Sequence, residues 1–277
     1  MTNESLSAVY PADRETDAVL RDGTAIRIRP VRPDDEPRLR AFFLGLSSRS
    51  RALRFFGTTS DDVVIAYARR AAEVDYDQTF GLVVVAGTDG RIVGHAAYQA
   101  TKAGSAEASF TVADDYQGRG LGTMLLGHLC EIAAMHGIGL FEALVRPHNT
   151  QMLEVCRESG FPISIRFTGS ELSVTFPTAL TQDALDRFYR RDQIAAEHAL
   201  RAFFAPIGVA VIGASRRRGT IGGEIFHNLL GYGLRVPVYP VNPAAATVQE
   251  VPAYRTVEEI PGPVDLAIIA VPAADVL

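Results

Sequence analysis

Hydrophobic and polar residues alternate over residues 106–112 and then recur with a helical period over residues 121–135. Glu107, Ser109 and Thr111 share one face of the first segment, and the alternate positions are apolar. A period of two indicates a strand, and apolar spacings of three and four indicate an amphipathic helix. The chain is therefore predicted to run from a strand through a glycine-rich loop into a helix that packs on a sheet. The apolar face of this helix comprises Leu121, Leu125, Leu129 and Ile132.

The same patterns predict strands and helices ahead of this unit. Asp22 and Gly23 are typical of a hairpin turn, and Asp34 or Asp35 is a candidate helix N-cap. Pro206 is expected to end a later helix. Strands are predicted within residues 19–29, 80–87, 92–100, 139–147, 163–167 and 171–176, and helices within residues 34–46, 47–56, 60–72, 149–160 and 181–204.

The C-terminal part of the chain has a different pattern. Residues 208–215, 236–243 and 264–272 are continuous apolar runs, and a glycine-containing turn at 219–223 opens a helix between the first two. Unbroken apolar strands that alternate with helices indicate a parallel sheet covered on both faces. We therefore predict a second α/β domain with doubly wound topology.

The glycine-rich loop of the first unit is a candidate anion site. Gly118, Gly120 and Gly122 remove three side chains at the start of the predicted helix. The first backbone N–H groups of a helix have no intrahelical partner, and the helix dipole is positive there. A phosphate can approach such a loop closely. The alternative is a tight strand-to-helix turn without a ligand.

The spacing of this loop carries a family resemblance. Gln117, Gly120 and Gly122 form Q-x-x-G-x-G, which resembles the coenzyme A pyrophosphate loop of GNAT N-acetyltransferases, whereas the dinucleotide-binding G-x-G-x-x-G does not fit. The resemblance implies a mixed, mainly antiparallel sheet flanked by helices over residues 19–176, and acetyl-CoA as co-substrate. Val112 would pair with pantetheine. The implied coenzyme-binding residues are Val112, Gln117, Gly118, Arg119, Gly120, Gly122, Thr123 and Asn149.

The C-terminal segment resembles the Rossmann-like CoA-binding domain of NDP-forming acyl-CoA synthetases. The matching positions are Gly213 to Ser215, Ile221 to Gly223, Val241 to Pro243, Val271 and Pro272. The resemblance implies a second CoA or a nucleotide bound by Gly213, Ser215, Gly222 and Asn242. We expect a helical linker over residues 177–205 and a partial Rossmann-like domain over residues 206–277, which ends earlier than the family's domain does and is expected to be truncated.

The transfer of an acyl group from a thioester to an amine requires a neutral amine. A lysine with a pKa near ~10.4 is almost wholly protonated at neutral pH, so a carboxylate base is useful. Glu107 lies on the predicted strand and matches the glutamate that Pat-type protein lysine acetyltransferases use as base. A surface glutamate without a catalytic role is the alternative. Asp114 and Asp115 are expected to orient the loop rather than to take a proton.

The residue that protonates the leaving thiolate is not evident. Cys156 stands where many GNAT sequences have a tyrosine, seven residues after Asn149. It lies near the departing sulfur or is a buried, inert thiol, and we favour the second. Asn149 holds coenzyme A, caps the following helix, or does both. His128, His136 and His148 are expected to be structural or exposed.

Composition restricts the classes of function. With 277 residues, 47% of them hydrophobic, and a formal net charge of −5, the chain is typical of a globular protein without general attraction to nucleic acid or an anionic membrane. Residues 1–18 lack a signal core, and no apolar run approaches the ~18 residues of a membrane helix. A cytoplasmic location is expected. The two cysteines indicate neither disulfides nor a zinc site, and no metal is predicted.

These features together predict a Pat-like N-acetyltransferase. The resemblance implies direct transfer of acetyl to a protein lysine, with an acyl-CoA synthetase as the candidate protein substrate. A GNAT enzyme that acetylates a small-molecule amine and a CoA-sensing regulatory module remain as alternatives. Arg49, Arg51 and Arg54 are predicted to form a solvated helix face rather than a site.

Overall fold

The computed structural model describes residues 9–20, 22–87, 89–102 and 104–272. The chain forms two compact units, residues Met1–Ala195 and Ala196–Leu277. The expectation that residues 1–18 lack a signal core falls partly on residues 1–8, which lie outside the described residues. The same holds for the side chains of residues 191–192, 194–199 and 201–202 in the helix that crosses the boundary.

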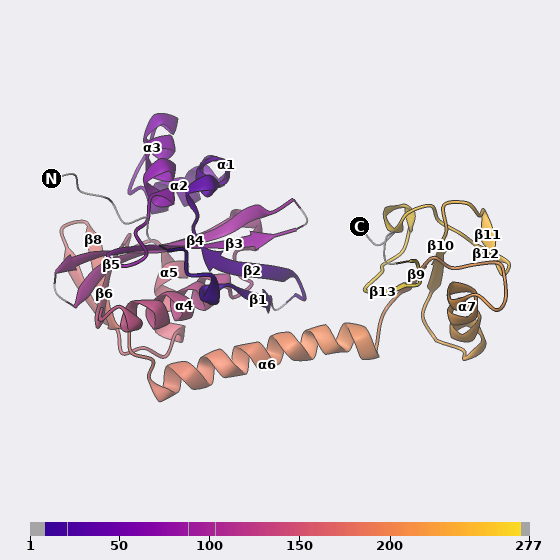
Figure 1. Ribbon diagram of the computed structural model, residues 1–277. Coiled ribbons are helices and arrows are strands. Elements are labelled where there is room, and N and C mark those ends of the chain that lie inside the picture. The colour runs from indigo at the N-terminus through magenta and orange to yellow at the C-terminus, as the bar shows by residue number, and fades with distance from the viewer. Residues whose placement is uncertain (1–8, 21, 88, 103, 273–277) are drawn as a thin grey trace. The chain divides into compact units, whose positions relative to one another are not determined.

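A mixed sheet forms the centre of the first unit (Figure 1). Its strands pair antiparallel except for β5 and β6, which are parallel. In spatial order the strands are β1 (Thr16–Val19), β2 (Ala25–Pro30), β3 (Thr79–Ala86), β4 (Arg91–Lys102), β5 (Ser105–Val112), β6 (Leu140–Val145), β8 (Glu171–Pro177) and β7 (Ser164–Thr168). This is the mixed, mainly antiparallel sheet that the family resemblance implies, with the first strand beginning three residues before residue 19.

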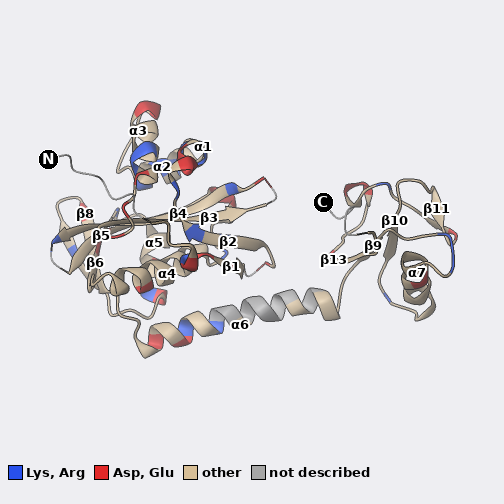
Figure 2. Cartoon of the chain, viewed as in Figure 1, with Lys and Arg blue, Asp and Glu red and all other residues tan. Residues whose placement is uncertain are grey.

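Helices cover both faces of this sheet, with α1 to α3 on one side and α4 and α5 on the other (Figure 1). The α-helices are α1 (Glu36–Leu44), α2 (Ser48–Arg54), α3 (Asp61–Ala72), α4 (Leu121–Met135), α5 (Thr150–Glu158) and α6 (Gln182–Phe204). Short 3-10 helices are η1 (Ala12–Arg14), η2 (Pro33–Asp35) and η3 (Asp114–Tyr116). In α3, acidic residues stand in the first turn and basic residues in the last (Figure 2), which complements the helix dipole.

Neighbouring residues of β4 show how the two helical layers meet the sheet. A β-carbon at Gly94 would lie 3.3 Å from the side chains of both Leu121 and Leu125 of α4. The ring of the next residue, His95, lies 5.4 Å from the ring of Phe43 in α1. Because successive strand residues point to opposite faces, β4 is buried from both sides. The predicted apolar stripe of α4 is confirmed, since Leu121, Leu125, Leu129 and Ile132 are at most 5% exposed.

The start of α1 differs from the prediction. Asp35 occupies the N-cap position, but its side chain does not cap α1. Its carboxylate instead accepts hydrogen bonds from Arg29 at 2.6 and 2.7 Å and from the Arg32 N–H at 2.8 Å. Arg29 and Asp35 are 5% and 1% exposed. The buried guanidinium competes for the carboxylate more strongly than the helix N–H groups do, because it carries a full charge.

The second unit contains a parallel sheet, as predicted. The spatial order is β10 (Val238–Val241), β9 (Val209–Ile212) and β13 (Leu266–Ile269), and α7 (Ile221–Gly231) packs beside β9 and β10. A small antiparallel ladder of β11 (Thr247–Val248) and β12 (Val251–Pro252), followed by η4 (Val257–Glu259), was not predicted. Val211, Ala214, Phe226 and Val248 form the buried core of this unit.

The linker boundaries at residues 177 and 205 stay a prediction. The helix α6 begins at Gln182 and runs through the division between the two units. Its N-terminal part packs on the first unit, where Gly160 approaches Ala184 and Gly127 approaches Phe188. In the described part of the chain, every helix is too short or too polar to cross a membrane.

The buried ion pair predicts a stability change. Asp35→Asn leaves the Arg29 guanidinium buried without a counter-charge and is expected to lower the free energy of unfolding by about 3 to 5 kcal/mol, measured by urea unfolding. Arg27→Gln, which removes an exposed pair with Asp17, is the control and should leave the midpoint close to wild type. An unchanged midpoint for Asp35→Asn would contradict a stabilising pair.

The same pair predicts a pH dependence. Burial raises the pKa of Asp35, but hydrogen bonds from Arg29 and from the Arg32 N–H outweigh it, so the pKa lies below its ordinary value. The stabilisation is therefore complete above the unfolded pKa of about 3.9 and is lost as the pH falls through the folded pKa.

Candidate functional site

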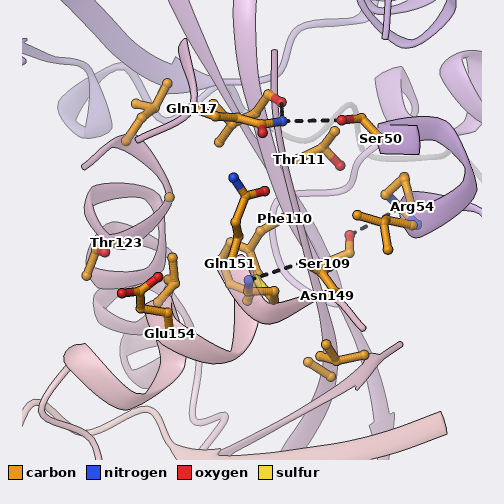
Figure 3. A pocket seen from close by; sticks show the side chains of 18 of the residues that line it. Ser50, Arg54, Ser109, Phe110, Thr111, Gln117, Thr123, Asn149, Gln151 and Glu154 are labelled. Atoms are coloured by element: carbon orange, nitrogen blue, oxygen red, sulfur yellow. Dashed lines mark hydrogen bonds between the residues drawn. The ribbon is translucent and has the colours of Figure 1, made fainter. Parts of the chain in front are cut away.

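A cavity of about 430 Å³ opens between β5 and β6. Its walls come from α2, β5, the loop before α4, the first turn of α4, β6 and α5 (Figure 3). Residues that are far apart in the sequence, such as Ser50, Glu107 and Asn149, therefore line one space.

The cavity exists because the parallel strands β5 and β6 separate after three paired residues. The two strands pair only from Ser105 to Glu107 on β5, opposite Leu140 to Glu142 on β6. Just after the end of β5, the Ala113 N–H donates to the Val93 carbonyl of β4 at 2.9 Å. Hydrogen-bonding direction alternates along an antiparallel pair, so the backbone groups of Val112 point away from β4, towards the cavity. The Val112 carbonyl there accepts a hydrogen bond from Gln117 Nε2 at 3.1 Å.

The glycines of the loop before α4 have different reasons to be glycine. Gly118 and Gly120 have φ values of +75° and +87°, a conformation that residues with a β-carbon adopt at a cost. Gly122 is helical, and a β-carbon there would lie 3.5 Å from Val155, an ordinary contact. Packing within the protein therefore does not require glycine at 122, whereas the close approach of a ligand would.

The loop is held by side chains on both sides. Besides Val112, Gln117 Nε2 donates to Ser50 Oγ at 3.3 Å (Figure 3). Asp114 accepts from Ser50 Oγ at 2.6 Å and from the Ser47 N–H at 2.8 Å. Burial raises the pKa of Asp114, but these bonds outweigh it and hold the pKa below its ordinary value. Hydrogen bonds from Arg91, at 2.8 and 3.1 Å, lower the pKa of Asp115. Both carboxylates therefore tie the loop to neighbouring elements, and that neither takes a proton in the reaction stays a prediction.

Of the other predicted coenzyme-binding residues, two line the cavity and one does not. Thr123 and Asn149 line the cavity, and Asn149 Oδ1 also accepts from the Met152 N–H at 3.2 Å, which makes it the N-cap of α5. The Arg119 side chain is paired with Asp22 at 2.8 Å and is absent from the cavity lining. Arg119 therefore differs from the other predicted residues of the loop, which line the cavity. The binding roles of these residues stay predictions.

Glu107 lines the cavity and is exposed. It stands where β5 and β6 begin to part, and its register partner Glu142 accepts a hydrogen bond from Ser173 at 2.7 Å instead of lining the cavity. Of these two neighbouring carboxylates, Glu107 lines the cavity and Glu142 does not. The role of Glu107 as a base remains a prediction.

Arg54 corrects the prediction of a solvated basic face on α2. Arg51 pairs with Asp61 at 2.6 Å, but Arg54 lines the cavity and its Nη2 donates to Ser109 Oγ at 3.3 Å (Figure 3). The same nitrogen donates to the Tyr67 hydroxyl. Sequence reasoning missed it because the three arginines share one short basic segment. The adjoining Phe55 and Phe56 were the available signal that this end of the helix turns inward.

Both cysteines are buried, which favours the inert-thiol alternative. Cys156 is 1% exposed and is absent from the cavity lining. Burial raises its pKa to about 11, and burial also raises the pKa of Cys130. Among the histidines considered, His136 Nδ1 shares a hydrogen bond with the Tyr98 hydroxyl at 2.6 Å. In the described ranges, no group of His, Cys, Asp and Glu side chains is placed to hold a metal ion.

In the second unit, the predicted ligand-binding residues have internal roles. A β-carbon on Gly222 would lie 2.0 Å from the Gly213 carbonyl oxygen, so the helix start can approach the β9 loop only with glycine. Ser215 Oγ accepts from the Arg217 N–H at 3.1 Å, and Asn242 Nδ2 donates to the Ala214 carbonyl at 2.7 Å. Binding of a second CoA or a nucleotide by these residues stays a prediction.

Comparison with known families agrees with both resemblances. Residues 48–161 match the model of the acetyltransferase (GNAT) family. Residues 208–277 match the model described as a CoA binding domain. The parted parallel pair and the glycine loop at the start of α4 belong to the first match, and the chain is a member of the GNAT acetyltransferase family.

Individual relatives divide between the two units. The chain is 34% identical over 145 residues to acetyltransferase PA5475 of Pseudomonas aeruginosa, covering 51% of this chain and 77% of that one. The crystal structure of the GNAT domain of S. lividans PAT is similar with 32% identity and a TM-score of 0.55, over 61% of this chain and 99% of that one. Acetate–CoA ligase [ADP-forming] II subunit alpha of Pyrococcus furiosus is 56% identical over 70 residues, which are 25% of this chain and only 15% of the subunit.

The glycine loop predicts stability changes of opposite sign. Gly120→Ala places a β-carbon in left-handed backbone and is expected to lower the free energy of unfolding by about 1 to 2 kcal/mol. Gly122→Ala restricts the unfolded chain without a clash and should raise it by about 0.4 to 1 kcal/mol. Urea unfolding followed by circular dichroism measures both. The reverse order would show that the loop conformation is different.

The buried thiols predict resistance to alkylation. In the native chain at neutral pH, iodoacetamide should modify neither Cys130 nor Cys156, because the thiolate is the nucleophile and burial disfavours it. Both should react in denaturant, which is the control. Intact-mass spectrometry counts the adducts, and rapid modification of Cys156 in the native chain would place it on an accessible surface.

Proposed function

We propose that this N-acetyltransferase transfers acetyl from acetyl-CoA directly to a lysine of a protein, with an acyl-CoA synthetase as the substrate. The observation that carries the proposal is a single cavity with a glycine loop at one end and an accessible carboxylate, Glu107, on its wall. The resemblance to Pat-type enzymes supports a protein as acceptor.

Acetyl-CoA fits the loop side of the cavity. The pyrophosphate would meet the N–H groups of residues 118–123 at the positive end of α4. Gly122 supports this placement, since packing alone does not demand a glycine there. Pantetheine would then run along β5, where the backbone groups of Val112 point towards the cavity.

The chemistry requires one base and one donor. Glu107 takes a proton from the lysine ammonium, directly or through water, and the neutral amine attacks the thioester carbonyl. The Val112 N–H stabilises the developing oxyanion, and loss of such a donor typically costs about 10²-fold or more. The C–S bond then breaks, the nitrogen releases its second proton to solvent as the amide forms, and solvent protonates the thiolate. Direct attack of the amine on the thioester needs no acyl-enzyme intermediate, and neither cysteine lines the cavity.

The test uses two neighbouring carboxylates. An acyl-CoA synthetase incubated with the chain and acetyl-CoA is expected to gain the mass of one acetyl group. Glu107→Gln should slow this gain by about 10² to 10⁴-fold, while Glu142→Gln, the matched control on the next strand, should retain the rate. Intact-mass spectrometry over time gives both rates.

Other outcomes favour the alternatives. Turnover of a free amine in a panel of amines, without transfer to protein, would favour a small-molecule acceptor. Binding of acetyl-CoA without any transfer would favour the sensing module. Equal rates for wild type and Glu107→Gln would remove Glu107 from the mechanism.

A further inference from the structure

The cavity wall carries a positive charge that the described part of the chain leaves without a negative partner. Arg54 lines the cavity at the end of α2. Its side chain donates hydrogen bonds to the uncharged hydroxyls of Tyr67 and Ser109, and the ion pairs of the described residues do not include it. This differs from Arg29, which is paired with Asp35. A partly buried cation without a counter-charge favours an anion beside it.

Unsatisfied polar atoms gather around this arginine. Among the described residues, the buried side-chain nitrogen and oxygen atoms without a hydrogen-bond partner are Arg54 Nε, Thr111 Oγ1 and both ring nitrogens of His95. Thr111 also lines the cavity, and it is the register partner of His95. Tyr67 lies under the Arg54 guanidinium at 4.5 Å and beside the His95 ring at 6.5 Å. Arg54, Tyr67, His95 and Thr111 therefore form one cluster beside the cavity, called the polar corner below.

The histidine in this corner does not supply a charge. Burial, and secondarily the charge of Arg54, lowers the pKa of His95 to about 3. His95 is therefore neutral at physiological pH. The net charge of the corner is that of the guanidinium alone.

We propose that Arg54 and Ser109 form a carboxylate-binding subsite inside the acetyltransferase cavity. A guanidinium and a carboxylate form charge-assisted hydrogen bonds with matching planar geometry. The proposal rests on the proposed function, because it assigns a specificity to the same cavity.

The position of the subsite limits which carboxylate it binds. Ser109 is two residues from Glu107 on the same face of β5, which places the two β-carbons about 7 Å apart. A carboxylate at Arg54 is therefore close to the reacting amine and the acyl carbon. It belongs either to the acyl group, as in succinyl-CoA, or to the acceptor, as an acidic residue beside the target lysine.

The first arm tests the acyl group by calorimetric titration of the full chain. Succinyl-CoA and butyryl-CoA have acyl chains of equal length and differ by the terminal carboxylate. If the acyl group supplies the carboxylate, wild type should bind succinyl-CoA at least about tenfold more tightly than butyryl-CoA. Arg54→Met should abolish this ratio and Arg54→Lys should retain part of it. Arg49→Met, an exposed arginine of the same helix that does not line the cavity, should match wild type.

The second arm tests the acceptor by initial rates of acetyl transfer. Two lysine peptides are compared, one with glutamate and one with glutamine on each side of the lysine. If the acceptor is the source, wild type and Arg49→Met should prefer the glutamate peptide by about tenfold, and Arg54→Met should show no preference.

Titration with acetyl-CoA separates the possible failures. Variants that bind acetyl-CoA as wild type does are folded, so a lost preference then reports the subsite itself. The two ratios are the affinity for succinyl-CoA over butyryl-CoA and the transfer rate for the glutamate over the glutamine peptide. If neither ratio exceeds one in wild type, or if neither changes in Arg54→Met, the carboxylate subsite is overturned while the proposed function stands. If wild type fails to bind acetyl-CoA, both are overturned.

Discussion

The separation of β5 from β6 is the constraint on which the rest of the first unit depends. Pairing stops at Glu107 and Glu142, so the following residues of β5 keep backbone groups that neither strand neighbour satisfies. The unpaired N–H and C=O groups of such a strand edge can form hydrogen bonds with an extended chain or an amide group beside it. The cavity, the anchoring of Gln117 on the Val112 carbonyl and the access of Glu107 all follow from this one opening.

Helices pack on both faces of β4, next to the opening. On one face Gly94 admits the leucines of α4, and on the other His95 lies among the rings of Phe43 and Tyr67. The polar corner around Arg54 lies next to this packing and forms part of the cavity wall. A close-packed interior transmits such placement directly to the site.

Glycine has two distinct uses in the two units. At Gly120 the backbone conformation requires it, and at Gly222 of the second unit the nearby Gly213 carbonyl leaves no room for a β-carbon. Both are consequences of internal geometry, whereas Gly122 has no such requirement. A glycine-rich loop is thus an argument for a ligand only at positions where packing leaves the side chain optional.

The sequence by itself determined the strand, loop and helix around residues 106–135, the meander before them and the parallel second unit, because periodicity and glycine backbone preferences act over a few residues. It did not reveal the β11 and β12 ladder, whose turn uses Gln249 and Glu250 at positive φ instead of glycine. Only the tertiary structure decided that Asp35 pairs with Arg29 and that Arg54 faces the cavity. Charge partners and burial depend on contacts between distant residues, as between Arg54 and Ser109, 55 positions apart.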